Sequence, residues 1–142
     1  MQDCAARLGR AIEEVLAGPE PEPEPPAPRI LVVEDDQASR VALVALFARR
    51  GWAVSFAGTV AEGLAMLRPP PDCVLLDLML PDGGGEAILA AARAGGLTTR
   101  VVVTTGLEDP DRLDAVARLG PDSMLPKPVA LEALWRACGD PS

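Results

Sequence analysis

The chain has 142 residues, 49% of them hydrophobic, which allows one domain with a sizeable core and argues against wholesale disorder. The 13 basic and 21 acidic residues give a formal net charge of −8, which disfavours non-specific binding of nucleic acid or of an anionic membrane surface. Histidine is absent, which excludes Ser-His-Asp and Cys-His catalysis, histidine-ligated metals and a phosphohistidine carrier.

Residues 1–18 are predicted to form a short amphipathic helix or a tail. Within 3–17, apolar residues recur at helical spacing, at Ala5, Leu8, Ile12, Val15 and Leu16. Because a helix of this length is marginal alone in water, three interpretations stay open. The segment is a docking or dimerisation helix, the end of an upstream module, or a frayed tail.

Residues 19–28 read PEPEPEPPAP and hold six of the chain's 15 prolines. This composition favours an extended polyproline II tether whose glutamates repel one another. At roughly 3.1 Å per residue, the tether spans up to about 30 Å. We therefore predict a linker here, followed by a folded domain over 29–142.

From Arg29 onwards, short apolar runs alternate with helical periodicities. The runs predict strands over 30–33, 53–57, 73–76, 100–104 and 123–125. Helices are predicted over 39–50, 60–68, 86–93, 110–119 and 130–137. In the first helix, one face carries Val41, Val44, Ala45 and Ala48. Thr59 is positioned to cap the second helix, and residues 81–85 are predicted to form a turn.

The alternation of five strands with five helices predicts an α/β fold. Uninterrupted apolar strands are typical of a parallel sheet that is covered on both faces, so the expected architecture is a doubly wound sheet with helices on both sides. In such sheets the functional residues gather at the carboxyl ends of the strands.

Polar residues follow four of the five predicted strands. In chain order they are Glu34-Asp35-Asp36, Asp77, Thr104-Thr105-Gly106 and Lys127. An aspartate at a strand end is often only a helix cap, and we favour that interpretation for Asp36. Four strand ends with compatible groups are harder to ascribe to chance, because those ends meet at one edge of the sheet.

The chemistry of this set is that of phosphoryl transfer. Crowded carboxylates need a cation, and oxygen ligands select a hard ion such as Mg²⁺ or Mn²⁺. A carboxylate can act as the nucleophile and form an aspartyl phosphate. Lys127 is the only lysine in the chain, and its ammonium group suits a compact phosphoryl site.

The segments ILVVEDD, VLLDLMLPDGGG, VVVTTG and DSMLPKP together resemble the receiver domain of two-component response regulators, over residues 29–138. The resemblance implies a flavodoxin-like five-stranded parallel sheet of order 2-1-3-4-5. It also implies that Asp77 is the phosphoacceptor, Thr105 the conserved hydroxyl and Lys127 the conserved lysine. The Lys127-Pro128 bond is one that the family usually holds cis.

The resemblance further implies a divalent ion, Mg²⁺ or alternatively Mn²⁺. The implied ligands are Glu34, Asp35, Asp77 and the backbone carbonyl of Met79. The family has Asp more often than Glu at the position of Glu34. Its switching aromatic residue on the last strand is replaced here by Met124, which puts the usual coupling of threonine to a ring in doubt.

The expected function is therefore that of a receiver that takes a phosphoryl group from a histidine kinase or phosphotransfer protein. It would be no enzyme beyond its own phosphorylation and dephosphorylation. A surface within 110–137 is expected to bind an output partner or a second copy, with no nucleic acid and no membrane as partner. The chain is expected to be a single-domain receiver or a module of a larger protein.

Three further observations bear on location and on alternatives. Three dispersed cysteines without a CxxC pair indicate reduced thiols, and no run approaches 18 apolar residues, so a cytoplasmic protein is expected. An aspartate-nucleophile phosphatase would need an acid two residues after Asp77, where Met79 stands. A dinucleotide-binding enzyme lacks its glycine fingerprint, whereas a pseudo-receiver that docks without phosphorylation stays open.

Overall fold

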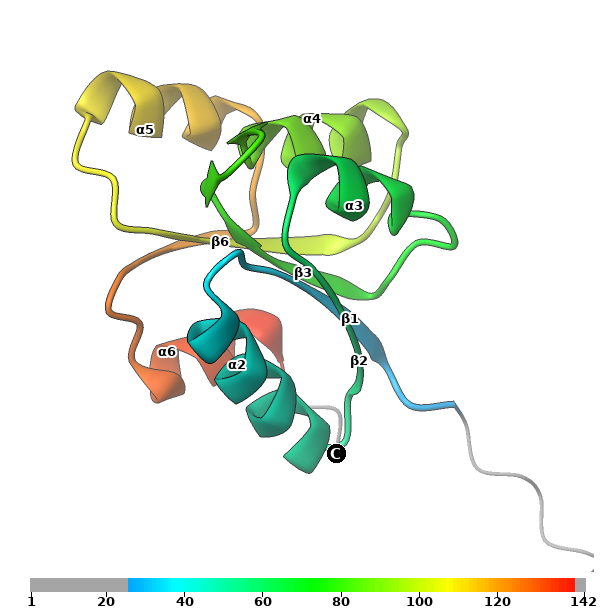
Figure 1. Cartoon of the computed structure of the whole chain (residues 1–142). Helices are drawn as coiled ribbons and strands as arrows, with labels where there is room; N and C mark the ends of the chain where they lie inside the picture. Colours follow the sequence, from blue (N-terminus) through cyan, green and yellow to red (C-terminus); the bar gives the residue numbers. More distant parts are fainter. Residues whose placement is uncertain (1–25, 140–142) are drawn as a thin grey trace, which may run out of the picture.

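A parallel sheet of five strands lies between two layers of helices in the computed structural model, which describes residues 26–139 (Figure 1). Its strands are β1 (Arg29–Val33), β2 (Ala53–Ala57), β3 (Cys73–Asp77), β6 (Arg100–Thr105) and β7 (Ser123–Pro126). They lie in the order β2-β1-β3-β6-β7. Because β6 and β7 are the fourth and fifth strands of this sheet in chain order, this confirms the predicted order 2-1-3-4-5. The two remaining strands, β4 (Met79–Leu80) and β5 (Gly83–Gly84), form a separate antiparallel hairpin where the sequence predicts a turn.

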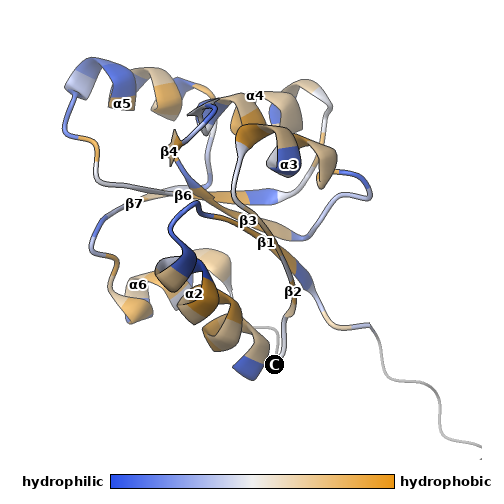
Figure 2. Cartoon of the chain, viewed as in Figure 1, coloured by the Kyte–Doolittle hydropathy of each residue, from blue (hydrophilic) through white to orange (hydrophobic). Residues whose placement is uncertain are grey.

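Helices cover both faces of the sheet, as predicted. In Figure 1, α3 (Val60–Ala65), α4 (Glu86–Ala94) and α5 (Pro110–Arg118) lie on one face, while α2 (Gln37–Arg49) and α6 (Leu131–Cys138) lie on the other. Each face has its own buried apolar cluster. Every residue of β3 is buried, and Figure 2 shows apolar colour along the central strands. The uninterrupted apolar runs of β1, β3 and β6 are therefore explained by burial on two sides.

Side-chain caps mark the starts of α2 and α3. The Asp36 carboxylate accepts a hydrogen bond of 2.9 Å from the Ser39 N–H, and the Thr59 hydroxyl accepts one of 3.0 Å from the Glu62 N–H. Both caps confirm the sequence predictions. Helix α3 ends at Ala65 instead of reaching residue 68, because a residue that precedes proline, as Arg68 does, disfavours the helical conformation.

Helix α2 packs through a different face from the one that carries Val41, Val44, Ala45 and Ala48. Phe47 is fully buried against the sheet, whereas Val41 is 60% exposed. The Phe47 ring lies 5.1 Å from the Trp135 ring and 6.1 Å from the Trp52 ring, edge to face in both cases. The bulkier side chain thus decides which face is buried, and a second apolar face remains in contact with solvent.

The predictions for the N-terminal part of the chain fall largely outside the described residues. The segment 1–18 is not described, and of the linker only residues 26–28 are. The domain boundaries that the sequence predicts therefore stay predictions.

Candidate metal and phosphoryl site

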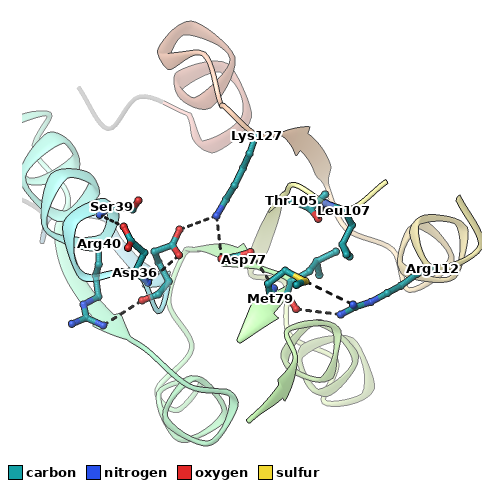
Figure 3. Close-up of polar contacts among 11 residues, drawn as sticks. Asp36, Ser39, Arg40, Asp77, Met79, Thr105, Leu107, Arg112 and Lys127 are labelled. Carbon is teal, nitrogen blue, oxygen red and sulfur yellow. Dashed lines mark hydrogen bonds and ion pairs between the residues drawn. The ribbon is translucent and has the colours of Figure 1, made fainter. Parts of the chain in front are cut away.

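The strands bring the candidate residues to one edge of the sheet. Strand β1 is followed by Glu34 and Asp35, β3 ends with Asp77, β6 ends with Thr105, and Lys127 follows β7. Because β1, β3, β6 and β7 are consecutive neighbours in a parallel sheet, their carboxyl ends meet. Figure 3 shows Asp77 between the loop that follows β1 and the strand end that carries Thr105.

Three carboxylates form the acidic part of the site. Glu34, Asp35 and Asp77 can each offer one oxygen such that the three oxygens lie within 4.8 Å of one another. Glu34 and Asp77 are only 4% exposed, whereas Asp35 is exposed. Burial raises the pKa of Glu34 above its ordinary value, and the nearby Asp77 raises it further, against the opposing effect of Lys127.

Lys127 joins two of these carboxylates. Its ammonium nitrogen lies 3.1 Å from Glu34 Oε1 and 3.1 Å from Asp77 Oδ2, so one cation faces two buried anions (Figure 3). Burial by itself lowers the pKa of Lys127, but the hydrogen bonds to Asp77 and Glu34 outweigh burial, and the pKa is raised. Lys127 therefore stays charged in the described arrangement. The Lys127–Pro128 bond is cis, as the resemblance implies.

The neighbouring backbone orients the other oxygen of Asp77. Asp77 Oδ1 accepts a hydrogen bond of 3.1 Å from the Met79 N–H. On the next strand, the buried Thr105 hydroxyl accepts a hydrogen bond of 2.9 Å from the Leu107 N–H. Thr105 thus sits at the start of the loop that leads to α5, in contact with the backbone of that loop.

The structure also places at this edge a residue that the sequence analysis does not single out. From α5, the Arg112 guanidinium forms two hydrogen bonds of 2.8 Å to the Glu86 carboxylate and one of 3.2 Å to the Leu78 carbonyl. The hydrogen bond to Arg112 lowers the pKa of Glu86. Arg112 is 34 residues from Leu78 in the chain, and no local pattern signals this contact.

The donor set fits a hard divalent ion. The three carboxyl groups lie close together, and within the described residues Lys127 forms ion pairs with two of them. An oxygen-only set of few carboxylates with one exposed member suits Mg²⁺ or Mn²⁺, which keep open positions for water or phosphate oxygens. In this arrangement Glu34, Asp35 and Asp77 could hold such an ion.

The fold and this site place the chain among the open α/β domains whose functional residues lie at the carboxyl edge of the sheet. The chain belongs to the response regulator receiver domain family, whose model matches residues 30–138. It is similar to the transcriptional activator protein PfeR of Pseudomonas aeruginosa, with 41% identity over 110 residues that cover 77% of this chain and 36% of that protein. It is also similar to the response regulator MprA of Mycobacterium leprae, with 36% identity over 107 residues that cover 75% of this chain and 47% of that protein.

Solved structures agree with this assignment. A CheY-like response regulator receiver domain protein from Methanospirillum hungatei superposes with a TM-score of 0.71 and 28% identity, covering 78% of this chain and 89% of that one. The chain spans less than half the length of the two curated relatives named above. Any activity or partner that this chain shares with those whole proteins is therefore a proposal.

Proposed function

We propose that this chain is the phosphoacceptor receiver of a two-component system and that Asp77 accepts the phosphoryl group. The observation that supports this most directly is the buried Asp77 carboxylate at the end of the central strand. It lies 3.1 Å from Lys127 and beside two further carboxylates. A histidine kinase or phosphotransfer protein is the expected donor.

In the proposed step, a carboxylate oxygen of Asp77 attacks the phosphorus of the donor's phosphohistidine. The new O–P bond forms as the N–P bond breaks, and the imidazole keeps the electron pair and takes up a proton from solvent. Lys127 can turn from Asp77 Oδ2 towards a phosphoryl oxygen and offset its charge, and the Thr105 hydroxyl can donate to another. A divalent ion held by Glu34, Asp35, Asp77 and the Met79 carbonyl would supply the remaining positive charge. Apart from this phosphorylation and its reversal, no catalysis is proposed.

A groove adjoins the site at Glu34 and Lys127, the two residues that face Asp77 across it. It has a volume of about 560 Å³ and runs between α2 and the residues that follow β7. Its lining includes Glu34, Ala42, Lys127 and Val129. The groove therefore joins the charged site to an apolar surface, as an approaching protein that presents a phosphohistidine would need.

The proposed output surface lies on the other side of Asp77. The Thr105 hydroxyl bonds to the backbone of Leu107, and Leu107 and Met124 pack partly buried against the same apolar cluster. A shift of Thr105 towards a phosphoryl oxygen would release this bond and move the loop. We propose that the surface formed by 110–137 then binds an output partner or a second copy. Methionine adapts its packing at low cost, so the switch should be graded.

The direct test is phosphorylation of the full chain by acetyl phosphate with MgCl₂, followed by intact mass spectrometry. Wild type and Asp114→Asn, which alters an exposed aspartate on α5, should gain one phosphoryl group. Asp77→Asn should gain none, and Asp35→Ala should need far more Mg²⁺. Labelling of Asp77→Asn at the wild-type rate would refute the assignment. An unlabelled wild type that still binds its partner would support the pseudo-receiver instead.

Two further expectations stay predictions. Among residues 26–139, no helix is long and apolar enough to cross a bilayer, and the cytoplasmic location rests on the sequence alone. The absence of a nucleic-acid partner is proposed for these 142 residues only. Because one similar protein is a transcriptional activator, a whole protein that contains this chain could have a role in transcription.

A further inference from the structure

A groove lies on the outer side of α2, and its lining includes none of the proposed site residues. It has a volume of about 420 Å³. Its lining is mostly apolar and consists of Gln37, Arg40, Val41, Val44, Ala45 and Ala48 of α2 and Phe56 of β2. Val41 is 60% exposed and Phe56 is 53% exposed. Large side chains with this exposure on adjacent elements form a patch that gains free energy from being covered.

The wall of this groove is held in place by contacts within the domain. The Arg40 guanidinium lies 5.2 Å from the centroid of the Phe56 ring and donates a hydrogen bond of 3.3 Å to the Glu34 carbonyl. Phe56 is also fixed by the pairing of β2 with β1, opposite Val32. The groove is thus preformed, which lowers the cost of binding a segment in it.

We infer that the occupant of this groove is the chain's own segment 3–17, bound as a helix. The segment lies outside the described residues, and its fit rests on its sequence. Its apolar residues from Ala5 to Leu16 would form a stripe about 17 Å long on a helix, whereas the apolar lining from Val41 to Ala48 along α2 is about 11 Å long. The stripe is therefore long enough to cover the apolar lining of the groove.

The tether has the right length and starting point. Residue 28 lies at the beginning of the sheet, where the Pro28 carbonyl accepts a hydrogen bond of 2.8 Å from the Ala53 N–H. From Ala53, Phe56 is three residues further along β2, or about 10 Å. The linker 19–28 spans up to about 30 Å, so it can return the helix to α2 with length to spare.

The size of the groove favours an occupant from the same chain over a second copy. Stable complexes between proteins usually bury about 1,200–2,000 Å² in total, and a groove with two large exposed side chains offers only part of that. A short linker raises the effective concentration of the segment to about the millimolar range, at which weak apolar contacts suffice. Docking would in turn stabilise a helix that is marginal alone.

A thiol in the segment allows a sharp test in the full chain. Cys4 falls on the same helical row as Leu8, Ile12 and Leu16, while Cys73 and Cys138 are buried. Gln37→Cys and Ala48→Cys place a partner thiol at either end of the groove, and Ala115→Cys places an exposed control thiol on α5. Under mild oxidation, one of the two groove variants should form an intrachain disulfide at least about tenfold faster than the control.

A second substitution separates docking from chance collision. Val41→Asp should reduce the disulfide rate of the faster groove variant to that of the Ala115→Cys control. Because Val41 is 60% exposed, the domain should stay folded. Equal rates in both groove variants and the control, or no effect of Val41→Asp, would overturn the inference. Disulfides that form mainly between chains and decrease on dilution would overturn it in favour of a second copy.

Discussion

Replacing Gly85 with alanine should disturb the proposed phosphoacceptor through its backbone. Gly85 precedes α4 with helical dihedral angles (φ −62°, ψ −19°), so alanine meets no conformational penalty there. A Cβ atom at this position, however, would lie less than 3.0 Å from the Asp77 carbonyl oxygen and 3.1 Å from its carbonyl carbon. Because backbone cannot turn aside as a flexible side chain does, either the end of β3 or the start of α4 must shift.

Overpacking of this kind costs about 1–3 kcal/mol. At about 4 °C per kcal/mol for a domain of this size, the melting temperature of Gly85→Ala should fall by about 4–12 °C. The shift would also move the Asp77 carboxylate relative to Lys127, so labelling by acetyl phosphate should slow by about tenfold or more.

Gly106→Ala is the matched control at the same edge of the sheet, because a Cβ there meets no atom within 4 Å. Its stability should stay within about 0.5 kcal/mol of wild type. Thermal unfolding and timed intact-mass labelling of the three proteins check both effects. A Gly85→Ala variant that melts and labels like wild type would show that the close approach to Asp77 has no consequence.

Three other substitutions test the charges and the switch. Without divalent ions, the free energy of unfolding of Asp77→Asn, measured by denaturant, should be about 1 kcal/mol higher than that of wild type, because the substitution removes one of three crowded carboxylates. Mg²⁺ should stabilise Asp77→Asn less than it stabilises wild type. Glu86→Gln should cost about 0.5–1 kcal/mol at pH 7 through its loss of the charged bond to Arg112. Since Arg112 holds the pKa of Glu86 below its usual 4.5, stability from this pair is present above pH 4.5 and is lost as the pH falls through the lowered pKa; denaturation from pH 7 to pH 3 should show wild type and variant converging. Thr105→Ala should weaken the effect of beryllofluoride on partner binding or self-association more than it slows phosphorylation, and an unchanged response would rule out the Thr105 route.

Local patterns were enough to predict most of the architecture. The uninterrupted apolar runs predicted the central strands because β1, β3 and β6 are buried on both faces, whereas the edge strands β2 and β7 are partly exposed. The caps at Asp36 and Thr59 were predictable because a cap bonds to a backbone N–H three residues away. The convergence of Glu34, Asp77 and Lys127 followed from the rule that parallel strand ends share one edge.

The tertiary structure decided what spacing leaves open. Periodicity places Val41 and Ala48 on one face of α2, but only packing shows that Phe47 takes the core and leaves that face to solvent. In the same way, the contact of Arg112 with the Leu78 carbonyl joins residues that no local pattern relates. A sequence fixes the order of side chains along an element, whereas the face that is buried and the distant groups that meet depend on how all the elements fit together.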